Sequence, residues 1–421
     1  MDHVETFQPY AEPHSRERLA WAILLTAFFV FAVLAVSVPL TARWYIHNAT
    51  RAQPATVQGS SATTLISMAG APGPLALQAG GRQENVGEGS TISTDNTSQA
   101  IITLFDRSQI TVFPNSQVTL QRMRRPRFSR SSRPNEIVAG VTRGRVRATI
   151  PPAGERSLRF DVRTPQAHAS LGEGSTAIEV SNDVSHVSVR AGTAMVAGQT
   201  GQPVSLAEGQ RSDVRLGQAA SSPLPAARNL IRNGDFENLL AVLPIKQGAI
   251  ADGWEAYNDQ GGDGGEVDGS VEAGTWGSRR AVRFYRSGSN NNHGETGVRQ
   301  DLGNKYVGDY RSLRLRLDIN IVSQSLSGGG YLSSEFPVIV RVNYRDAYGN
   351  ENHWTHGFYY QNPANYHIEN GELIARDTWY SYEGPNLKDL IPNLAFISSI
   401  QIYASGWDYE AFVSDAGLIA E

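Results

Sequence analysis

Residues 100–120 read AIITLFDRSQITVFPNSQVTL, and this stretch decides how the middle of the chain folds. Its apolar side chains recur at every second position within three runs, at Ile102 and Leu104, Ile110 and Val112, and Val118 and Leu120. The triplets Asp106-Arg107-Ser108 and Pro114-Asn115-Ser116 separate the runs with residues typical of turns. A period of two is typical of strands with one buried face, so the stretch predicts a double hairpin.

The same pattern extends over residues 65–216, in short alternating runs broken by glycine and proline. Further strands are predicted within residues 141–150, 160–162, 176–180, 187–189 and 194–196. No stretch in this region shows the 3.6-residue period of a helix of convincing length. We therefore expect an all-β domain over residues 65–216.

The N-terminal region contains an uncharged apolar run, Leu19–Leu40. At about 1.5 Å per residue a helix of this length spans roughly 33 Å, enough to cross the hydrocarbon core of a bilayer. We interpret it as an uncleaved transmembrane helix, preceded by a short cytoplasmic tail (1–18) and followed by a flexible stalk (41–64). A cleaved signal peptide is the alternative, but the run is longer than the apolar core of a typical signal sequence.

The orientation of this helix follows from what lies on each side of it. Arg16 and Arg18 precede the run and Arg43 and Arg51 follow it, so the positive-inside rule does not decide. The 18-residue tail is too short to fold alone, whereas the large β-patterned region lies C-terminal to the helix. We expect a single-pass protein of the cell membrane with its C-terminal domains outside the cytoplasm.

Composition divides the rest of the chain in two. Residues 56–227 contain 17 Arg, no Lys and 12 acidic residues, a net charge of +5, whereas residues 228–421 carry a net charge of −9. No Trp occurs between Trp44 and Trp254. The whole chain has a net charge of −4 and no cysteine, so we expect no nucleic-acid partner, no disulfide and no Cys-ligated metal. We expect two separately built domains joined by a linker at residues 217–228.

The middle region resembles the FecR domain of ferric-citrate-type transmembrane regulators. The motifs that carry the resemblance come in the family's order and lie at residues 86–94, 100–120, 141–146, 160–167, 172–180, 187–192 and 206–210. Asp106-Arg107-Ser108 stands where the family has Asp-Gly-Ser, and Phe160-Asp161-Val162-Arg163-Thr164-Pro165 matches its F-x-V-x-T-P signature. The resemblance implies an extracytoplasmic domain that acts in signal transduction or as a protein-interaction scaffold. The 18 residues before the helix leave no room for the cytoplasmic anti-sigma segment that the resemblance also implies.

The C-terminal region, residues 229–421, resembles a galactose-binding-like jelly roll of the kind found in carbohydrate-binding modules. The resemblance rests on the opening NLIRNGDFE at 229–237, on Ala251-Asp252-Gly253-Trp254 and on the closing strand at 410–418. It implies a β-sandwich fold and a structural calcium ion that joins the first strand to the last, with Asp235, Glu237 and Asp415 as candidate ligands. Hard carboxylate oxygens suit calcium. The alternative is that these acidic side chains only cap turns, and we expect no other cofactor.

Aromatic residues are dense in the C-terminal region. Sugar rings present apolar faces, so exposed Trp and Tyr side chains beside polar groups make natural platforms for glycans. The candidate platform consists of Trp354, Trp379, Trp407 and Tyr409. The alternative is that these rings pack in the core or on the sheets, where aromatic residues are common.

An arginine cluster follows the double hairpin, between residues 122 and 133. Its members are Arg122, Arg124, Arg125, Arg127, Arg130 and Arg133. The cluster interrupts the strand pattern and is surrounded by Ser, Pro and Asn, which favours a solvated, mobile insertion loop. The functional alternative is a patch that contacts anionic lipid, an acidic envelope polymer or the acidic face of a partner.

No catalytic signature is present, because the chain lacks GxSxG, HExxH and a P-loop, and we expect a protein that is not an enzyme. The sequence therefore predicts a mostly β, membrane-anchored envelope protein that carries a FecR-like domain and a β-sandwich jelly roll. Its FecR-like domain is expected to act in signal transduction or as a scaffold for an envelope protein partner. The alternative is a surface adhesion protein whose jelly roll binds a polysaccharide.

Overall fold

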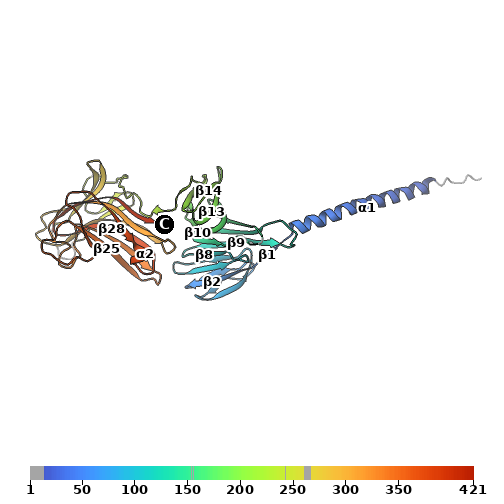
Figure 1. Cartoon of the computed structure of the whole chain (residues 1–421), viewed down its shortest axis with the longest axis horizontal. Helices are drawn as coiled ribbons and strands as arrows, with labels where there is room; N and C mark the ends of the chain where they lie inside the picture. Colours follow the sequence, from blue (N-terminus) through green and yellow to red (C-terminus); the bar gives the residue numbers. More distant parts are fainter. Residues whose placement is uncertain (1–13, 153, 155, 242, 260–266) are drawn as a thin grey trace, which may run out of the picture.

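The computed structural model describes residues 14–152, 154, 156–241, 243–259 and 267–421. A long helix extends from one end of a first β domain, and a second β domain lies at the opposite end of the first (Figure 1). The expectation of a mostly β chain with one apolar helix and β-sandwich domains is confirmed. The first 13 residues of the predicted cytoplasmic tail lie outside the described residues.

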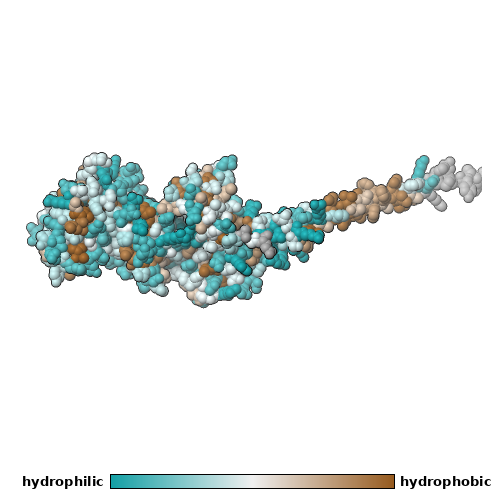
Figure 2. Space-filling model, in the orientation of Figure 1, coloured by the Kyte–Doolittle hydropathy of each residue, from teal (hydrophilic) through white to brown (hydrophobic). Residues whose placement is uncertain are grey.

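Helix α1 spans His14–Asn48 and contains the apolar run. Its segment Glu17–Asn48 is long and apolar enough to cross a membrane, and its large apolar side chains are exposed. Figure 2 shows this helix as a hydrophobic rod beside two largely hydrophilic domains. Length and composition are those of a membrane span, and a signal sequence at the N-terminus shares them.

The predicted stalk at 41–64 is wrong. Residues 41–48 continue α1, and Thr50–Ala52 and Ala55–Ser61 form strands β1 and β2 of the first domain. Small and polar residues in this segment hide the strand pattern. In β2 the side chains of Ala55 and Val57 are buried, although the residues around them are small and polar. The helix therefore enters the domain directly and not through a flexible segment.

The first domain is one strongly coiled, 16-stranded sheet with a single apolar core. Its remaining strands are β3 (Thr64–Ser67), β4 (Leu75–Leu77), β5 (Arg82–Val86), β6 (Thr91–Ser93), β7 (Gln99–Thr103), β8 (Gln109–Val112), β9 (Gln117–Pro126), β10 (Asn135–Ile150), β11 (Leu158–Arg163), β12 (His168–Val180), β13 (Val184–Ala197), β14 (Val204–Leu206), β15 (Gln210–Arg215) and β16 (Leu224–Pro225). β10 organises the sheet, because it pairs with β8, β9, β11 and β12 along its length.

The three strands that the sequence predicts over residues 100–120 are present as β7, β8 and β9, but only β7 and β8 form a hairpin, because β8 and β9 pair with β10 and not with each other. All six alternating apolar side chains are buried, at 3% exposure or less. The first turn is closed by the Asp106 carboxylate, which accepts hydrogen bonds from the Ser108 N–H and hydroxyl at 3.1 and 2.7 Å. The turn also places Arg107 at φ 72°, a left-handed conformation that disfavours every residue with a Cβ.

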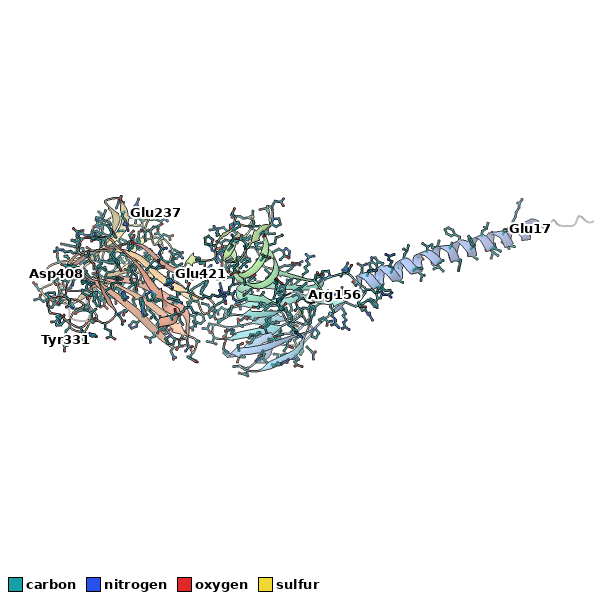
Figure 3. All side chains as sticks on the ribbon, viewed as in Figure 1. Glu17, Arg156, Glu237, Tyr331, Asp408 and Glu421 are labelled. Atoms are coloured by element: carbon teal, nitrogen blue, oxygen red, sulfur yellow. The ribbon has the colours of Figure 1, made fainter. Side chains whose placement is uncertain are left out.

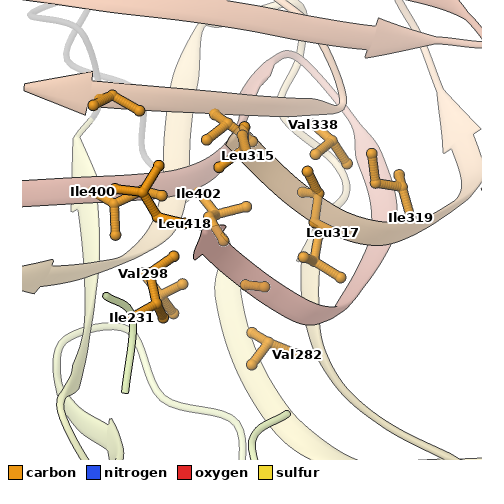
Figure 4. Close-up of a cluster of buried hydrophobic side chains, with 14 of the residues drawn as sticks. Ile231, Val282, Val298, Leu315, Leu317, Ile319, Val338, Ile400, Ile402 and Leu418 are labelled. Carbon is orange, nitrogen blue, oxygen red and sulfur yellow. The ribbon is translucent and has the colours of Figure 1, made fainter. Parts of the chain in front are cut away.

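The second domain consists of two sheets that face each other across the larger apolar core (Figure 4). A six-stranded sheet contains β17 (Arg228–Asn229), β20 (Ser270–Trp276), β21 (Arg279–Arg286), β23 (Leu313–Gln324), β27 (Tyr380–Asn386) and β29 (Tyr409–Ala420). A seven-stranded sheet has the order β18 (Gly248–Ala251), β19 (Trp254–Asp259), β22 (Gly294–Tyr306), β28 (Leu394–Gly406), β24 (Val338–Asp346), β25 (Glu351–Tyr359) and β26 (Gly371–Leu373). A short helix, α2 (Leu387–Leu390), follows β27.

The two domains are docked, and the predicted linker at 217–228 is largely absent. Its residues include β16 and the start of β17, which pairs with the end of β29. Hydrogen bonds from the Gln199 N–H and the Ser221 N–H tie the segment 218–221 and its neighbours to the first domain. Little free chain is left to separate the domains.

A buried cluster of charges joins the domains, and Asp309 of the second domain lies at its centre. Arg145 and Arg147, both on β10, donate to the Asp309 carboxylate at distances of 2.6–2.9 Å. The Asp309 side chain is only 5% exposed. Arg145 and Arg147 alternate along β10, a pattern typical of the solvent side of a strand, but the structure buries both beneath the second domain.

Glu179 of the first domain makes the reciprocal contacts. Its carboxylate pairs with Arg145 at 2.9 Å, with Arg228 at 3.3 Å and with the ammonium group of Lys305. The Arg145 guanidinium also lies over the Tyr310 ring, 4.6 Å from the ring centroid. Phe113 and Tyr306 extend the contact as an aromatic pair across the interface, with centroids 5.3 Å apart. We call Arg145, Arg147, Glu179, Arg228, Lys305 and Asp309 the interdomain charge cluster.

Replacing Asp309 with Asn should release the two domains from each other. The change keeps the shape of the side chain but leaves Arg147 buried without its counter-charge and Arg145 with Glu179 as its remaining carboxylate, which costs about 3–5 kcal/mol. We expect the full chain to unfold in two separated transitions and to be cut faster by protease between residues 217 and 228. The matched control is Asp318→Asn, which removes a partly exposed ion pair with Arg279 inside the second domain. Equal effects of the two changes would contradict a special role for Asp309.

The interdomain charge cluster makes the docking of the two domains depend on pH. Burial would raise the pKa values of Glu179 and Asp309, but Lys305, Arg228 and the two β10 arginines outweigh it and hold both below their usual range. A carboxyl whose pKa is lowered by folding stabilises the native state above its unfolded pKa, about 4, and this contribution is lost as the pH falls further. Domain docking should therefore be constant from pH 7 to about pH 5 and weaken below about pH 4. Denaturant titrations across this range measure it, and an Asp309→Asn chain should show a shallower acid slope.

Arg107→Gly should stabilise the first domain. Glycine adopts φ 72° without the clash that a Cβ causes, and the gain outweighs its greater entropy in the unfolded chain, for a net of about 0.5–1 kcal/mol. Thermal unfolding of the full chain measures the effect as a rise in the transition of the first domain. Arg82→Gly, at an exposed strand position with ordinary backbone angles, should lower that transition, and a rise for both would contradict the explanation.

Candidate functional site

The outer face of the seven-stranded sheet carries a regular grid of polar and aromatic side chains. Strand register aligns one row as Tyr257, Gly297, Tyr403, Ile339 and Gly357, and the next row as Glu255, Arg299, Gln401, Arg341 and Thr355. A third row contains Asp301, Ser399, Asn343 and His353. The alternate residues of these strands, such as Val340 and Ile402, fill the core. The β alternation thus presents one polar face across five neighbouring strands.

Two hollows on this face meet at His353. One has a volume of about 550 Å³ and is lined mainly by polar side chains, among them Arg299, Asn343 and Ser399. The other has a volume of about 330 Å³ and is lined by Arg341, Thr355 and Tyr403 together with residues of the segment 333–336. His353 lines both. We call the combined surface the sheet groove.

Two glycines make room for the rings of the groove. A Cβ on Gly297 would lie 2.3 Å from the Cβ of Tyr403, and a Cβ on Gly357 would lie 2.3 Å from the Phe336 ring. The rings therefore lie directly over backbone. Tyr257 and Tyr403 also face each other, with centroids 6.5 Å apart. Tyr403 and Phe336 are only 2% and 3% exposed, so these rings form the floor of the groove, and the half-buried Tyr257 lies beside Tyr403.

Arg341 is the central charge of the groove. Its guanidinium lies over the Tyr403 ring, 5.2 Å from the centroid, which is a cation–π geometry. Burial raises the pKa of Tyr403 to about 12, so its hydroxyl stays protonated at neutral pH. Burial and the nearby Arg341 charge lower the pKa of His353, so this imidazole is neutral at pH 7. The groove therefore places the neutral Tyr403 hydroxyl and His353 imidazole near the Arg341 cation, and further charged side chains such as Arg299 and Asp301 also line it.

Three buried polar atoms of this face have no hydrogen-bond partner within the part of the chain that the structure describes. They are Arg341 Nε, Gln401 Oε1 and Ser405 Oγ. Arg341 and Gln401 are register partners on β24 and β28, and Ser405 lies on the same strand as Gln401. An unpaired buried polar atom costs about 1–3 kcal/mol, so such atoms are usually satisfied by water or by a ligand. Arg341 and Gln401 thus place an unpaired donor beside an unpaired acceptor on this face, and Ser405 adds a hydroxyl four residues further along β28.

The structure does not gather the predicted aromatic platform. Trp354 is half-buried, packs against the core and stacks on His356, and the Arg279 guanidinium covers Trp379 at 4.7 Å from the ring centroid. Trp407 is half-buried in the turn between β28 and β29. Tyr409 is 2% exposed and its hydroxyl donates to Thr296 at 2.8 Å. Tyr409 is therefore a core residue, and none of the four lines the sheet groove.

Two of the three candidate calcium ligands, Asp235 and Asp415, lie in neighbouring turns. The Ala416 N–H donates to the Gly234 carbonyl at 2.9 Å, which places the turns of Asp235 and Asp415 side by side. Asp235, Glu237 and Asp415 are all exposed. Among the described residues, however, no three His, Cys, Asp or Glu side chains are arranged to hold a metal. The three carboxylates do not form a ligand set here, and the structural calcium remains a prediction.

The arginine cluster lies far from the sheet groove, at the end of the first domain that holds α1. Arg122, Arg124 and Arg125 belong to β9, so the strand continues where the sequence predicted an insertion loop. Arg127, Arg130 and Arg133 follow in the connection to β10. The loop expectation fails for the first three arginines because β9 continues to Pro126 and keeps Met123 and Pro126 buried between them and beyond them.

Sequence reasoning missed the residues of the sheet groove. The signal was present, because residues 338–343 and 399–404 alternate between aliphatic and polar or aromatic side chains. These runs predict strands, but a single sequence does not tell which strands are neighbours. Arg341 and Gln401 are 60 positions apart, and only the register of β24 with β28 brings them together.

A further cavity, of about 290 Å³, lies between the domains. Its walls include Asn96 and Pro114 of the first domain and Arg345, Lys388 and Phe396 of the second. Arg345 spans it by donating to the Asn96 carbonyl at 3.5 Å while its guanidinium lies over the Phe396 ring. Because its walls come from both domains, this cavity belongs to the interdomain contact.

Comparison with known protein families finds one match within the chain. Residues 90–195, from β6 to most of β13, match the family described as FecR protein. This confirms the resemblance drawn from the ordered motifs, and the first domain carries a FecR domain. No curated protein matches the chain.

Two kinds of solved structure are similar to parts of this chain. A protein described as an anti-sigma factor from Parabacteroides distasonis is 17% identical with a TM-score of 0.26, over 34% of this chain and 67% of that one. The family 11 carbohydrate-binding module of the cellulosomal cellulase Lic26A-Cel5E of Clostridium thermocellum is 14% identical with a TM-score of 0.28, over 47% of this chain and 95% of that one. The same module in complex with a β-1,3-1,4-mixed-linked tetrasaccharide gives 14% identity and a TM-score of 0.27, over 46% and 94%.

Proposed function

We propose that this chain is a membrane-anchored, non-catalytic envelope protein that binds a polysaccharide in the sheet groove. In this proposal the FecR domain is a scaffold that holds the groove at a fixed place relative to the membrane. The observation that carries the proposal is the set of unpaired buried polar atoms on Arg341, Gln401 and Ser405, all on one face of one sheet.

The chemistry of the groove fits a sugar chain. Each sugar hydroxyl both donates and accepts a hydrogen bond, so one ligand can satisfy an unpaired N–H and unpaired oxygens at the same time. The half-buried Tyr257 supplies apolar surface beside these polar atoms, next to the buried rings of Tyr403 and Phe336. Two hollows that meet at His353 give the groove the length to accept several sugar units and not only one.

Helix α1 and the contact between the two domains support the part of the proposal that concerns the position of the groove. Helix α1 has the length and composition of a membrane span, and it continues into β1 without a flexible segment. The interdomain charge cluster joins the FecR domain to the groove-bearing domain. A single pass of α1 with both β domains outside the cytoplasm would present the groove to envelope polysaccharides.

A second candidate function is signalling through a protein partner of the FecR domain, supported by the family match over residues 90–195. The two functions differ in what they need from the second domain. Signalling through the FecR domain alone does not require the polar atoms of the sheet groove. Substitutions in the groove therefore separate the two functions.

The test is binding of the full chain, in detergent, to a panel of polysaccharides by affinity electrophoresis. The double change Gln401→Leu with Thr355→Val keeps the side-chain volumes and removes polar groups from the centre of the groove. We expect it to weaken binding about tenfold or more, because two hydrogen bonds of about 1 kcal/mol each are lost. Thr275→Val, at an exposed position of the opposite sheet, is the matched control and should leave binding unchanged.

The same assay tests the two expectations drawn from the sequence. Trp379→Ala and Trp407→Ala should leave affinity unchanged if the groove is the site, and a chelator should change binding only if the structural calcium exists. A folded chain that binds no polysaccharide would overturn the proposal. Binding that is lost in the Trp variants and kept in the groove variant would move the site to the aromatic platform.

A further inference from the structure

The arginine-rich connection between β9 and β10 is hydrogen-bonded to the end of α1. Arg127 donates to the Tyr45 hydroxyl at 3.1 Å, and Arg133 donates to the Asn48 side-chain oxygen at 3.1 Å. The Ser131 hydroxyl donates to the His47 carbonyl at 2.7 Å, which satisfies one of the last carbonyls of the helix. The end of the helix and the arginine-rich segment therefore form one structural unit.

Arg156 fixes the shape of this segment from the other side. Its guanidinium donates to the carbonyls of Ser129, Ser131 and Arg133. Figure 3 shows Arg156 at the base of the helix, on the side of the first domain that faces away from the second. Strand β1 also pairs with β9 there, with Arg51 opposite Arg125.

The arginines of this region divide into two groups. Arg122 and Arg124 form ion pairs with Glu136 and Glu88. The Arg124 pair holds the pKa of Glu88 below its usual range against the opposing effect of burial. A second group has no acidic partner within the described residues and consists of Arg51, Arg125, Arg127, Arg130 and Arg133. These five side chains are exposed, and we call them the arginine collar.

The position of α1 in a membrane sets the height of the collar. The uncharged run ends at Leu40, and Tyr45 and Asn48 follow five and eight residues later. At about 1.5 Å per residue they lie roughly 7–12 Å beyond the hydrocarbon core. The headgroup layer of each leaflet is about 5–8 Å thick. Collar residues that contact Tyr45 and Asn48 therefore lie at the outer edge of the phospholipid headgroups.

We propose that the arginine collar binds the phosphates of anionic phospholipids in the leaflet from which α1 emerges. This inference rests on the membrane anchoring in the proposed function and not on the sheet groove. The guanidinium fork matches a phosphate with two parallel hydrogen bonds, and an anionic leaflet supplies many phosphates in one plane. The sequence left lipid, acidic polymer and acidic protein face as alternatives, and the attachment of the collar to the end of α1 favours lipid. Binding at this height would fix how the first domain sits on the membrane.

The test uses the full chain, which has no cysteine of its own. A single Ser132→Cys change at an exposed position beside the collar accepts a donor fluorophore. The labelled protein is reconstituted in vesicles of unlabelled phosphatidylcholine. Each vesicle preparation also contains a small fraction of a dye-labelled acceptor lipid, either the anionic phosphatidylglycerol or the neutral phosphatidylcholine. Both acceptor lipids carry the dye on an acyl chain and are present at the same mole fraction. We expect energy transfer to the anionic acceptor to exceed transfer to the neutral one, and the excess to disappear in 0.5 M NaCl.

The decisive variant is Arg125→Gln with Arg130→Gln. It removes two collar charges without touching the contacts of Arg127 and Arg133 to α1. We expect the enrichment of anionic acceptor to fall roughly twofold or more. The control is Arg280→Gln with Arg316→Gln, two exposed arginines of the second domain, which should leave the enrichment unchanged.

Two outcomes separate failure of the collar from failure of the anchor. A chain that floats with the vesicles at alkaline pH but shows equal transfer to both acceptors overturns the collar alone. A chain that fails to float overturns the anchoring and the collar together. Equal transfer combined with binding of soluble polyglutamate by the collar would assign these arginines to an acidic partner and would also overturn the proposal. None of these outcomes depends on polysaccharide binding.

Discussion

The carboxylate of Asp309 determines how the two halves of this molecule are joined. It is almost completely buried, and it accepts hydrogen bonds from two arginines that β10 presents side by side. Burying an ion is unfavourable unless it is paired, so these charges can lie beneath the interface only because they face each other. The opposite net charges of the two regions are therefore partly explained by this interface, where basic side chains of the first domain meet an acid of the second. Glu179 repeats the arrangement in the opposite direction, from the first domain to Lys305 of the second.

This interface gives the chain a defined axis. Helix α1 enters the FecR domain at one end, the second domain is fixed at the other, and Glu421 ends the chain at the junction between the two domains (Figures 1 and 3). The arginine collar and the sheet groove thus belong to different ends of one connected structure. A ligand in the groove and a lipid at the collar would each act on the same body, because no long flexible segment lies between α1 and β29 in the described chain.

The sequence predicts well what depends on local pattern. Period-two alternation in 100–120 identified β7, β8 and β9, and the uncharged run identified the core of α1. It fails where small polar residues form strands, as in Thr50–Ala52 and Ala55–Ser61, because their burial depends on neighbours distant in the chain. Arg145 and Arg147 show the same limit: an alternating pair of arginines is typical of a solvent face, and only the fold places a buried acid, 164 and 162 positions away, against it. The aromatic platform fails for a related reason, since a Tyr such as Tyr409 fits a core as well as a surface.

The most direct test of this account is whether the two domains hold one fixed arrangement in solution. Because the chain has no cysteine, Thr142→Cys and Ser381→Cys, both at exposed strand positions in different domains, provide two unique labelling sites. Single-molecule energy transfer between dyes at these sites measures the distribution of distances across the interface. The account predicts one narrow population at neutral pH. A broad or multiple distribution in the unaltered chain would contradict the claim that the interdomain charge cluster locks the FecR domain to the domain that carries the groove.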